Sequence, residues 1–271
     1  MINIVTTPVK TYLSKSKIAG FDYVINPYIG CPHKCVYCYA EYMRKFTGHS
    51  EEWGDFLDIK RCDIPLKPAK LFRTRVMLSS VTDPYNPYEK QCELTRNILK
   101  QLLYCQARVY ILTKSDLVLR DLDIFKQMKD IEVVFSFSSA EDAFRQKAEP
   151  MAGSVANKIT ALKTLHENGI KTAVMIAPLF PYLTDWKKII RLTKPYTSYY
   201  GFDSLNMRPA YQKKVLQFIS VHYPRVLPFY DEIFLQEKTN FWKVLEEENT
   251  DYCKAEQITA EVYFKRSGVM E

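Results

Sequence analysis

Three cysteines near the start of the chain have a spacing that suits metal binding. Cys31, Cys35 and Cys38 form a Cys-x3-Cys-x2-Cys run inside the stretch NPYIGCPHKCVYCYAEYM, residues 26–43. A structural zinc site is closed by four ligands, usually as two close pairs. This run supplies three ligands, and the chain has no second close pair of cysteines to complete it. A cube of four irons held by three thiolates would leave one iron open to a small molecule, so the sequence favours an iron-sulfur cluster.

Two other assignments compete for these cysteines. A zinc knuckle would need a fourth ligand, either His33 inside the run or one of the remote cysteines. The remote cysteines are Cys62, Cys92, Cys105 and Cys253. We expect them to be ordinary buried or half-buried thiols, because none has ligand spacing. A redox-active pair of Cys35 and Cys38 is the second alternative, but it leaves Cys31 without a role.

The elements that must position the cysteines alternate along most of the chain. Six short β-branched or aromatic runs predict strands: FDYVINPY (21–28), RVMLSS (75–80), ARVYILTK (107–114), IEVVFSFS (131–138), KTAVMIAP (171–178) and SYYGFDSLNM (198–207). Helical segments are expected after Cys35 and over residues 89–105, 119–129, 155–168 and 184–193. Strands that alternate with helices predict a parallel sheet. The fold class is therefore α/β, a partial six-stranded version of the β/α barrel with functional groups at the carboxyl ends of its strands.

The pattern changes from about Pro209 onward. Three segments there have helical character: YQKKVLQFISVHY, VLPFYDEIFLQ and FWKVLEEENTDYCKAEQITAEVYFKR, residues 211–223, 226–236 and 241–266. We expect residues 1–208 to form the barrel and residues 209–271 to form a helical C-terminal cap packed on it.

Composition sets broad limits on the class of protein. The chain has 271 residues, of which 47% are hydrophobic, enough for a sizeable core. The formal charge of +7 is compatible with an anionic partner such as nucleic acid but does not require one. The N-terminal residues contain no apolar run typical of a signal peptide, and no stretch of about 18 apolar residues predicts a membrane span. We expect a cytoplasmic protein whose seven cysteines stay reduced.

The segment GCPHKCVYCYA resembles the signature of the radical S-adenosylmethionine (SAM) superfamily, including the aromatic Tyr37 just before the third cysteine. The resemblance implies that Cys31, Cys35 and Cys38 hold a 4Fe-4S cluster. Its open iron would bind the methionine part of SAM, with Tyr37 beside the adenine. The implied chemistry is reductive cleavage of SAM to a 5′-deoxyadenosyl radical, which takes a hydrogen atom from the substrate. The cofactor supplies this chemistry, while the protein positions it and excludes solvent.

A narrower resemblance, over about the first two thirds of the chain, is to the spore photoproduct lyase-like branch. It rests on ordered segments: INPYIGCPHKCVYCYA, VTDPYNPYE, TKSDLVLRD, FSFSSAED, the pair Glu149 and Pro150, and IAPLFPYLTD. It implies that Asp83 binds the ribose hydroxyls of SAM with Thr82 beside it, that Lys114 meets the methionine carboxylate, and that Ser136 contacts the cofactor. A lysine beside a carboxylate also makes physical sense, because a charge-assisted hydrogen bond is stronger than a neutral one.

One position departs from the repair enzyme of that branch. The resemblance places a cysteine three residues before the aspartate, where it returns a hydrogen atom to the substrate radical. Ser80 occupies that position here. A hydroxyl O–H bond is too strong to donate hydrogen readily to a carbon radical, so we do not expect the chain to complete repair in the same way.

Three hypotheses for function follow. The first is hydrogen abstraction from a nucleic-acid-type substrate, with electrons from a flavodoxin or ferredoxin type of donor. The second is radical modification of a peptide or protein, with or without a partner radical enzyme. The third is a zinc-containing nucleic-acid-binding protein without catalysis.

Overall fold

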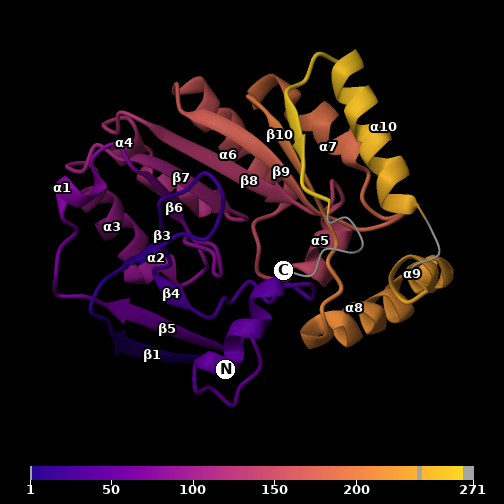
Figure 1. Ribbon diagram of the computed structural model, residues 1–271, viewed down its shortest axis with the longest axis horizontal. Coiled ribbons are helices and arrows are strands. Elements are labelled where there is room, and N and C mark those ends of the chain that lie inside the picture. The colour runs from indigo at the N-terminus through magenta and orange to yellow at the C-terminus, as the bar shows by residue number, and fades with distance from the viewer. Residues whose placement is uncertain (1, 237–239, 265–271) are drawn as a thin grey trace.

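The computed structural model describes residues 2–236 and 240–264. Its main sheet has eight strands in the order β11-β10-β9-β8-β7-β6-β3-β2 (Figure 1). The six predicted strands are all present, as β3 (Tyr23–Ile25), β6 (Arg75–Leu78), β7 (Arg108–Thr113), β8 (Ile131–Phe137), β9 (Lys171–Leu179) and β10 (Tyr200–Ser204). Each pairs in parallel with the next. The strand order has two ends rather than closing on itself, which confirms the α/β partial barrel.

Both edges of this sheet carry an additional strand. At one edge β2 (Leu13–Lys15) pairs antiparallel with β3, and at the other β11 (Ala260–Val262) pairs parallel with β10. The strand β11 corrects the expectation of a helix over residues 241–266. Residues 265 and 266 of that segment lie outside the described ranges. The helix α10 (Phe241–Ala255) ends early because Gln257 adopts a left-handed backbone with φ of +53°. The run after it contains β-branched residues that favour a strand.

The predicted helices between the strands are present but shorter or divided. The segment 89–105 forms α2 (Glu89–Cys92) and α3 (Leu94–Leu102), separated by a left-handed Glu93 with φ of +48°. The remaining connections contain α1 (Pro68–Leu71), the 3-10 helix η2 (Asp116–Asp121), α4 (Leu122–Phe125), α5 (Asp142–Ala148), α6 (Val155–Glu167), α7 (Trp186–Thr193) and η3 (Lys194–Tyr196). Ser154 and Asp185 begin α6 and α7 by accepting a backbone N–H, as helix N-caps do.

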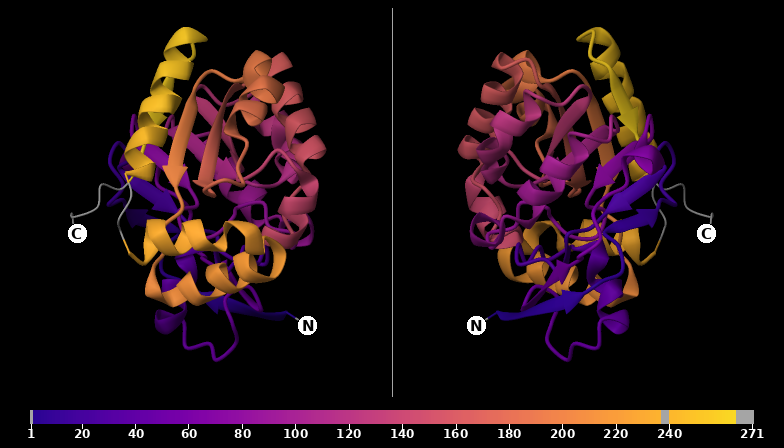
Figure 2. Two further views of the ribbon diagram at one scale, coloured as in Figure 1. Left: turned by 90° about the vertical axis from the view of Figure 1, so that its right-hand side faces the viewer. Right: turned by 90° about the vertical axis from the view of Figure 1, so that its left-hand side faces the viewer.

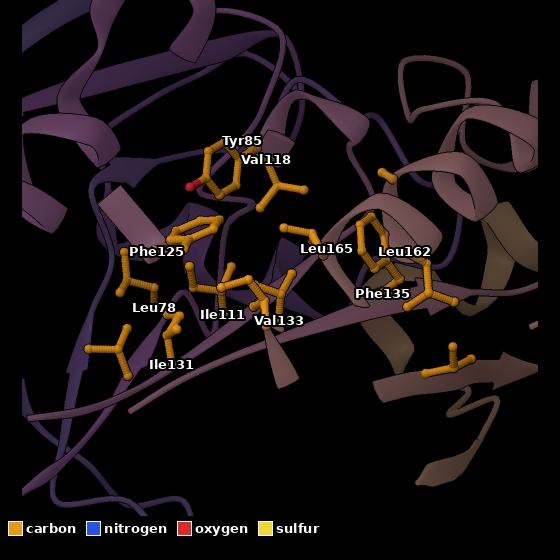
Figure 3. Close-up of a cluster of buried hydrophobic side chains, with 14 of the residues drawn as sticks. Leu78, Tyr85, Ile111, Val118, Phe125, Ile131, Val133, Phe135, Leu162 and Leu165 are labelled. Carbon is orange, nitrogen blue, oxygen red and sulfur yellow. The ribbon is translucent and has the colours of Figure 1, made fainter. Parts of the chain in front are cut away.

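The main core lies between the sheet and the helices on its outer face. Side chains of β6, β7 and β8 meet those of α4 and α6, among them Leu78, Ile111, Val133, Phe125 and Leu162 (Figure 3). All five are at most 2% exposed. This packing fixes the carboxyl ends of the strands, where the candidate site lies.

A small second sheet that the sequence did not predict lies beside the first. It consists of β1 (Asn3–Pro8), β5 (Phe56–Arg61) and β4 (Tyr28–Ile29) in the order β1-β5-β4. The three cysteines follow β4 directly, and the 3-10 helix η1 (Tyr39–Phe46) follows the cysteines. The second sheet therefore anchors the start of the cysteine loop.

Two helices of the C-terminal segment cover the end of the sheet at which the parallel strands finish, whereas α10 (yellow) runs alongside the sheet (Figure 2). The helices α8 (Pro209–His222) and α9 (Leu227–Phe234), joined by η4 (Pro224–Val226), share a buried cluster with Tyr37, Phe144 and Phe180. The division of the chain after residue 208 stays a prediction. Within the described residues, no helix combines the length and apolarity that crossing a membrane would need.

Candidate functional site

The cysteine loop begins at Gly30, a position where only glycine fits. Gly30 has φ of +85°, and a Cβ atom there would lie 2.4 Å from the carbonyl oxygen of Phe56. Only glycine fits such a close backbone approach without strain. Cys31 follows it and is buried, while Cys35 and Cys38 are half-buried. The second sheet thus positions the first of the three thiols.

The surroundings of the three sulfurs suit bound thiolates better than free thiols. Burial is the largest influence on all three cysteines and raises the pKa of each thiol. Against this, the backbone N–H groups of His33 and Asp83 act to lower the pKa of Cys31, and that of Ala40 acts to lower the pKa of Cys38. Donors aimed at a buried sulfur favour its negative form, and a metal centre supplies the positive charge that such thiolates need. The residues present therefore fit an iron-sulfur cluster.

A single-ion site is a poorer fit. Over residues 2–236 and 240–264, no three His, Cys, Asp or Glu side chains converge on one metal ion. Zinc requires its ligands within about 2.0–2.3 Å of one centre, whereas a four-iron cube holds its thiolates farther apart. His33, the fourth ligand considered for zinc, is 1% exposed and turned toward Asp83, with 3.4 Å between Nδ1 and Oδ2.

Lys114 and Ser136, predicted as cofactor contacts, lie together at the ends of β7 and β8. The Lys114 ammonium donates to the Ser136 hydroxyl at 2.6 Å, and that hydroxyl donates to the Ala177 carbonyl oxygen at 3.1 Å. Burial acts to lower the pKa of Lys114, but its anionic neighbours, Glu149 first and then Cys35 and Asp83, together outweigh burial and the net pKa is raised. The lysine is therefore a fixed cation at the carboxyl edge of the sheet.

Glu149 lies at the centre of a buried polar network. Its Oε1 accepts hydrogen bonds from the hydroxyls of Tyr37 and Ser138, and the Lys114 ammonium lies 3.4 Å from the same oxygen. Burial acts to raise the pKa of Glu149, but the neighbouring lysines outweigh it and lower the pKa to about 2. The Glu149 carboxylate is charged and joins the cysteine loop, through Tyr37, to the cationic Lys114.

Lys158 of α6 completes this network and was not singled out in the sequence. It is 1% exposed, donates to the Ser136 carbonyl oxygen at 3.0 Å, and lies 4.0 Å from Oε2 of Glu149. Burial lowers its pKa to about 8, so it is mostly protonated at neutral pH. The Glu149 carboxylate therefore lies between two ammonium groups beside the cysteine loop, and the Asp83 carboxylate also acts on Lys114.

Asp83 and Thr82, predicted to meet the ribose, are held by protein groups. The Asp83 carboxylate accepts the Thr113 hydroxyl at 2.8 Å and the backbone N–H groups of Lys114 and Tyr85 at 2.8 and 2.9 Å. Thr82 donates to the Gly30 carbonyl oxygen at 2.7 Å. Asp83 thereby ties the end of β6 to the end of β7, and Thr82 ties it to the cysteine loop. Their contacts with a ribose stay predictions.

Ser80 lies next to this region and is half-buried. Its backbone N–H donates to the Asn26 side chain at 2.8 Å, and the Asn26 amide faces the Ser80 hydroxyl at 3.4 Å. Asn26 also accepts the N–H of Val81 at 3.2 Å, so it holds the turn after β6 against the end of β3. The Ser80 side chain is fixed at the carboxyl edge of the sheet.

Comparison with known proteins shows which family the chain belongs to. The model of the radical SAM superfamily matches residues 25–193, which include the cysteine loop, Lys114, Ser136 and Glu149. An uncharacterized protein of Methanocaldococcus jannaschii is 41% identical over 223 residues, 82% of this chain and 85% of that protein. The chain belongs to the radical SAM superfamily. Members of this superfamily are enzymes that use a 4Fe-4S cluster and SAM and require a reductant.

Solved structures show the same fold. A spore photoproduct lyase mutant with bound AdoMet and dinucleoside spore photoproduct has a TM-score of 0.65 at 16% identity, covering 97% of this chain and 82% of that chain. Streptococcus suis SuiB bound to precursor peptide SuiA has a TM-score of 0.55 at 16% identity, covering 90% of this chain and 48% of that chain. This radical SAM protein therefore has the fold of the spore photoproduct lyase-like structures, as its motifs predicted.

Proposed function

We propose that the chain uses Cys31, Cys35 and Cys38 to hold a 4Fe-4S cluster and cleaves SAM to abstract hydrogen from a nucleic-acid-type substrate. The observation that carries the cofactor part is the joint placement of Lys114, Ser136 and Glu149 beside the cysteine loop. The bound cluster and SAM would supply the radical. The chain itself would position the cofactor and the substrate and would exclude water.

The protein groups have distinct tasks in this proposal. Lys114 would bind the methionine carboxylate by a charge-assisted hydrogen bond, with Ser136 orienting its ammonium. Glu149 would keep Lys114 protonated and hold the Tyr37 ring against the adenine side of the site. Thr82 and Asp83 would hold the loop that faces the ribose. Any direct ribose contact would be made beside the hydrogen bonds they already form, from Thr82 to the Gly30 carbonyl oxygen and from the Thr113 hydroxyl to Asp83.

The nucleic-acid substrate class is supported by likeness of fold and by charge. The spore photoproduct lyase structure matches over more of its own length than the SuiB structure does, 82% against 48%. The formal charge of +7 also suits a phosphate-bearing substrate. Because Ser80 stands where a thiol would be needed, we do not propose the repair reaction itself.

An isotope experiment tests the substrate class. The chain is reconstituted anaerobically with iron and sulfide, reduced with dithionite and given SAM, first alone and then with a deuterated nucleic acid. A flavodoxin or ferredoxin type of donor is expected to replace dithionite. We expect release of 5′-deoxyadenosine that carries deuterium from the nucleic acid. No 5′-deoxyadenosine under any condition would contradict the enzyme assignment. Deuterium transfer from a peptide pool, but not from nucleic acid, would replace the substrate class by peptide or protein modification.

A further inference from the structure

A buried tryptophan lies against the cysteine loop without a conventional hydrogen-bond partner. Trp53 precedes β5, is 6% exposed and packs edge-on against Phe56 at 5.6 Å between ring centroids. It shares a buried cluster with Cys31 and Ala40, and Cys38 packs against that cluster. The indole N–H has no hydrogen-bond partner among the residues that the structure describes. A buried donor left unpaired is destabilising, so this one calls for an acceptor.

The sulfur of Cys38, which packs against the same buried cluster, is the candidate acceptor for this N–H. Burial is the main influence on the Cys38 thiol and raises its pKa, while the indole N–H acts in the opposite direction by favouring the thiolate. The indole N–H forms no hydrogen bond to the Cys38 thiol in the described residues, and a neutral thiol is a weak acceptor. A thiolate bound to iron is a stronger acceptor, because it carries negative charge.

The turn that carries Trp53 contacts the cysteine loop at Lys34 and β1 at Asn3. Gly54 has φ of +103°, and a Cβ atom there would lie 2.7 Å from Cγ of Lys34. Lys34 in turn pairs with Asp55, and the backbone of Asp55 accepts the N–H of Asn3 at 2.8 Å. The indole is therefore held by its own loop, by β1 and by the residue between two of the cysteines.

From this geometry we propose that the indole N–H of Trp53 donates to the Cys38 thiolate of the bound cluster and raises the reduction potential of that cluster. Adding an electron increases the negative charge on the cluster sulfurs, so a donor at a sulfur stabilises the reduced state more than the oxidised state. The inference rests on the proposed function, in which Cys38 is a cluster ligand. Trp53 is a positioning and tuning residue, which touches a ligand and not the substrate.

The test is a redox titration of the reconstituted chain, followed by electron paramagnetic resonance. Trp53→Phe keeps an aromatic ring and removes the N–H. We expect it to retain about four irons and to lower the equilibrium constant for reduction about tenfold, a shift of about 59 mV to more negative potential. Trp186→Phe is the matched control, because Trp186 is also 6% exposed but packs on Phe202 and Tyr252. Its potential should equal that of the wild type.

A second variant separates the N–H from the shape of the ring. Replacement of Trp53 by 3-benzothienylalanine keeps the bicyclic ring and exchanges the N–H for sulfur, and it should reproduce the negative shift. Variants with full iron content and wild-type potential would overturn the inference and leave the proposed function standing. Loss of iron in both Trp53 variants would also overturn it, because the role would then be cluster assembly. A wild-type chain that binds no cluster would overturn the proposed function itself.

Discussion

The Lys114 ammonium lies 2.6 Å from the Ser136 hydroxyl, across the carboxyl ends of two neighbouring parallel strands. The two residues are more than twenty positions apart in the sequence, and the register of β7 against β8 brings them together. A lysine held in this way has its position fixed before any ligand arrives. Such preorganisation lowers the entropy cost of binding a carboxylate.

Replacing Lys114 should weaken SAM binding to the reconstituted chain. A hydrogen bond to a charged group contributes about 1.5–3 kcal/mol, so Lys114→Met should raise the dissociation constant for SAM roughly 10- to 100-fold. Anaerobic calorimetry measures this constant directly. Lys163→Met is the control, because Lys163 is exposed on α6, where it pairs with Glu167 and lies over the Tyr196 ring. Equal SAM affinity in Lys114→Met and the wild type would remove Lys114 from the cofactor site.

Loss of one ligand should abolish cluster binding. We expect Cys31→Ala to lose most of its iron on reconstitution, because three thiolates are the minimum support of the proposed cluster. Cys105→Ala provides the matched control, since Cys105 is 1% exposed but lies after α3 and away from the loop. Iron content and visible absorbance are measured for both. A Cys31→Ala protein with full iron content would contradict the assignment of this cysteine.

Removing the charge of Glu149 should destabilise the chain in a pH-dependent way. Breaking a buried ion pair by removing one partner costs roughly 3–5 kcal/mol, so Glu149→Gln should lower the free energy of unfolding at pH 7 by about this amount. The native pKa of Glu149 is lowered from an ordinary 4.5 to about 2. Its stabilising contribution is therefore present above pH 4.5 and is lost as the pH falls through 4.5 toward 2.

Urea unfolding at several pH values checks this dependence. The gap between the wild type and Glu149→Gln should be largest near neutral pH and should narrow toward pH 3. Glu141→Gln serves as the control, because Glu141 is exposed and pairs with an exposed Lys188. A gap that is constant between pH 7 and pH 3 would show that the Glu149 carboxylate is not the group responsible.

The glycine before the first cysteine should tolerate no side chain. Gly30→Ala must adopt a left-handed backbone, which costs roughly 1–2 kcal/mol, and must also relieve the contact of its Cβ with Phe56. Gly48→Ala shares the positive φ, here +76°, but has nothing within 4 Å of the added Cβ. We expect Gly30→Ala to lose more stability than Gly48→Ala and to bind less iron. Calorimetry of thermal unfolding measures the stability of both variants. Equal losses of stability would contradict the predicted clash of the added Cβ with Phe56.

The sequence predicted the parts of the site that have local signals. Each of the six strands has a β-branched or aromatic run, and the three cysteines have a spacing that few other functions need. Lys158 was missed because a lysine within a helix is usually exposed. Its signal was nevertheless present: Val155, Lys158, Leu162 and Leu165 fall at spacings of three and four residues, which place them on one buried face.

Other features have no local signal. The pairing of β1 with β5 joins segments about fifty residues apart, and the exposed side chains of β1 show no alternation that would predict a strand. The cofactor contact of Asp83 stays a prediction, but the hydrogen bonds that Asp83 accepts from Thr113, Lys114 and Tyr85 were not predicted from the sequence. Such contacts depend on tertiary packing and on strand register, which short-range patterns do not specify.

The strand β11, which follows α10 and pairs at the edge of the main sheet, affects the tendency of the protein to aggregate. In the described fold β11 pairs with Tyr200–Phe202 of β10 and supplies hydrogen bonds to the outermost barrel strand. A chain shortened before Ala260 would expose that edge, with its row of unpaired N–H and C=O groups, to any other extended segment in solution. The short strand β11 therefore protects this edge of the sheet against self-association.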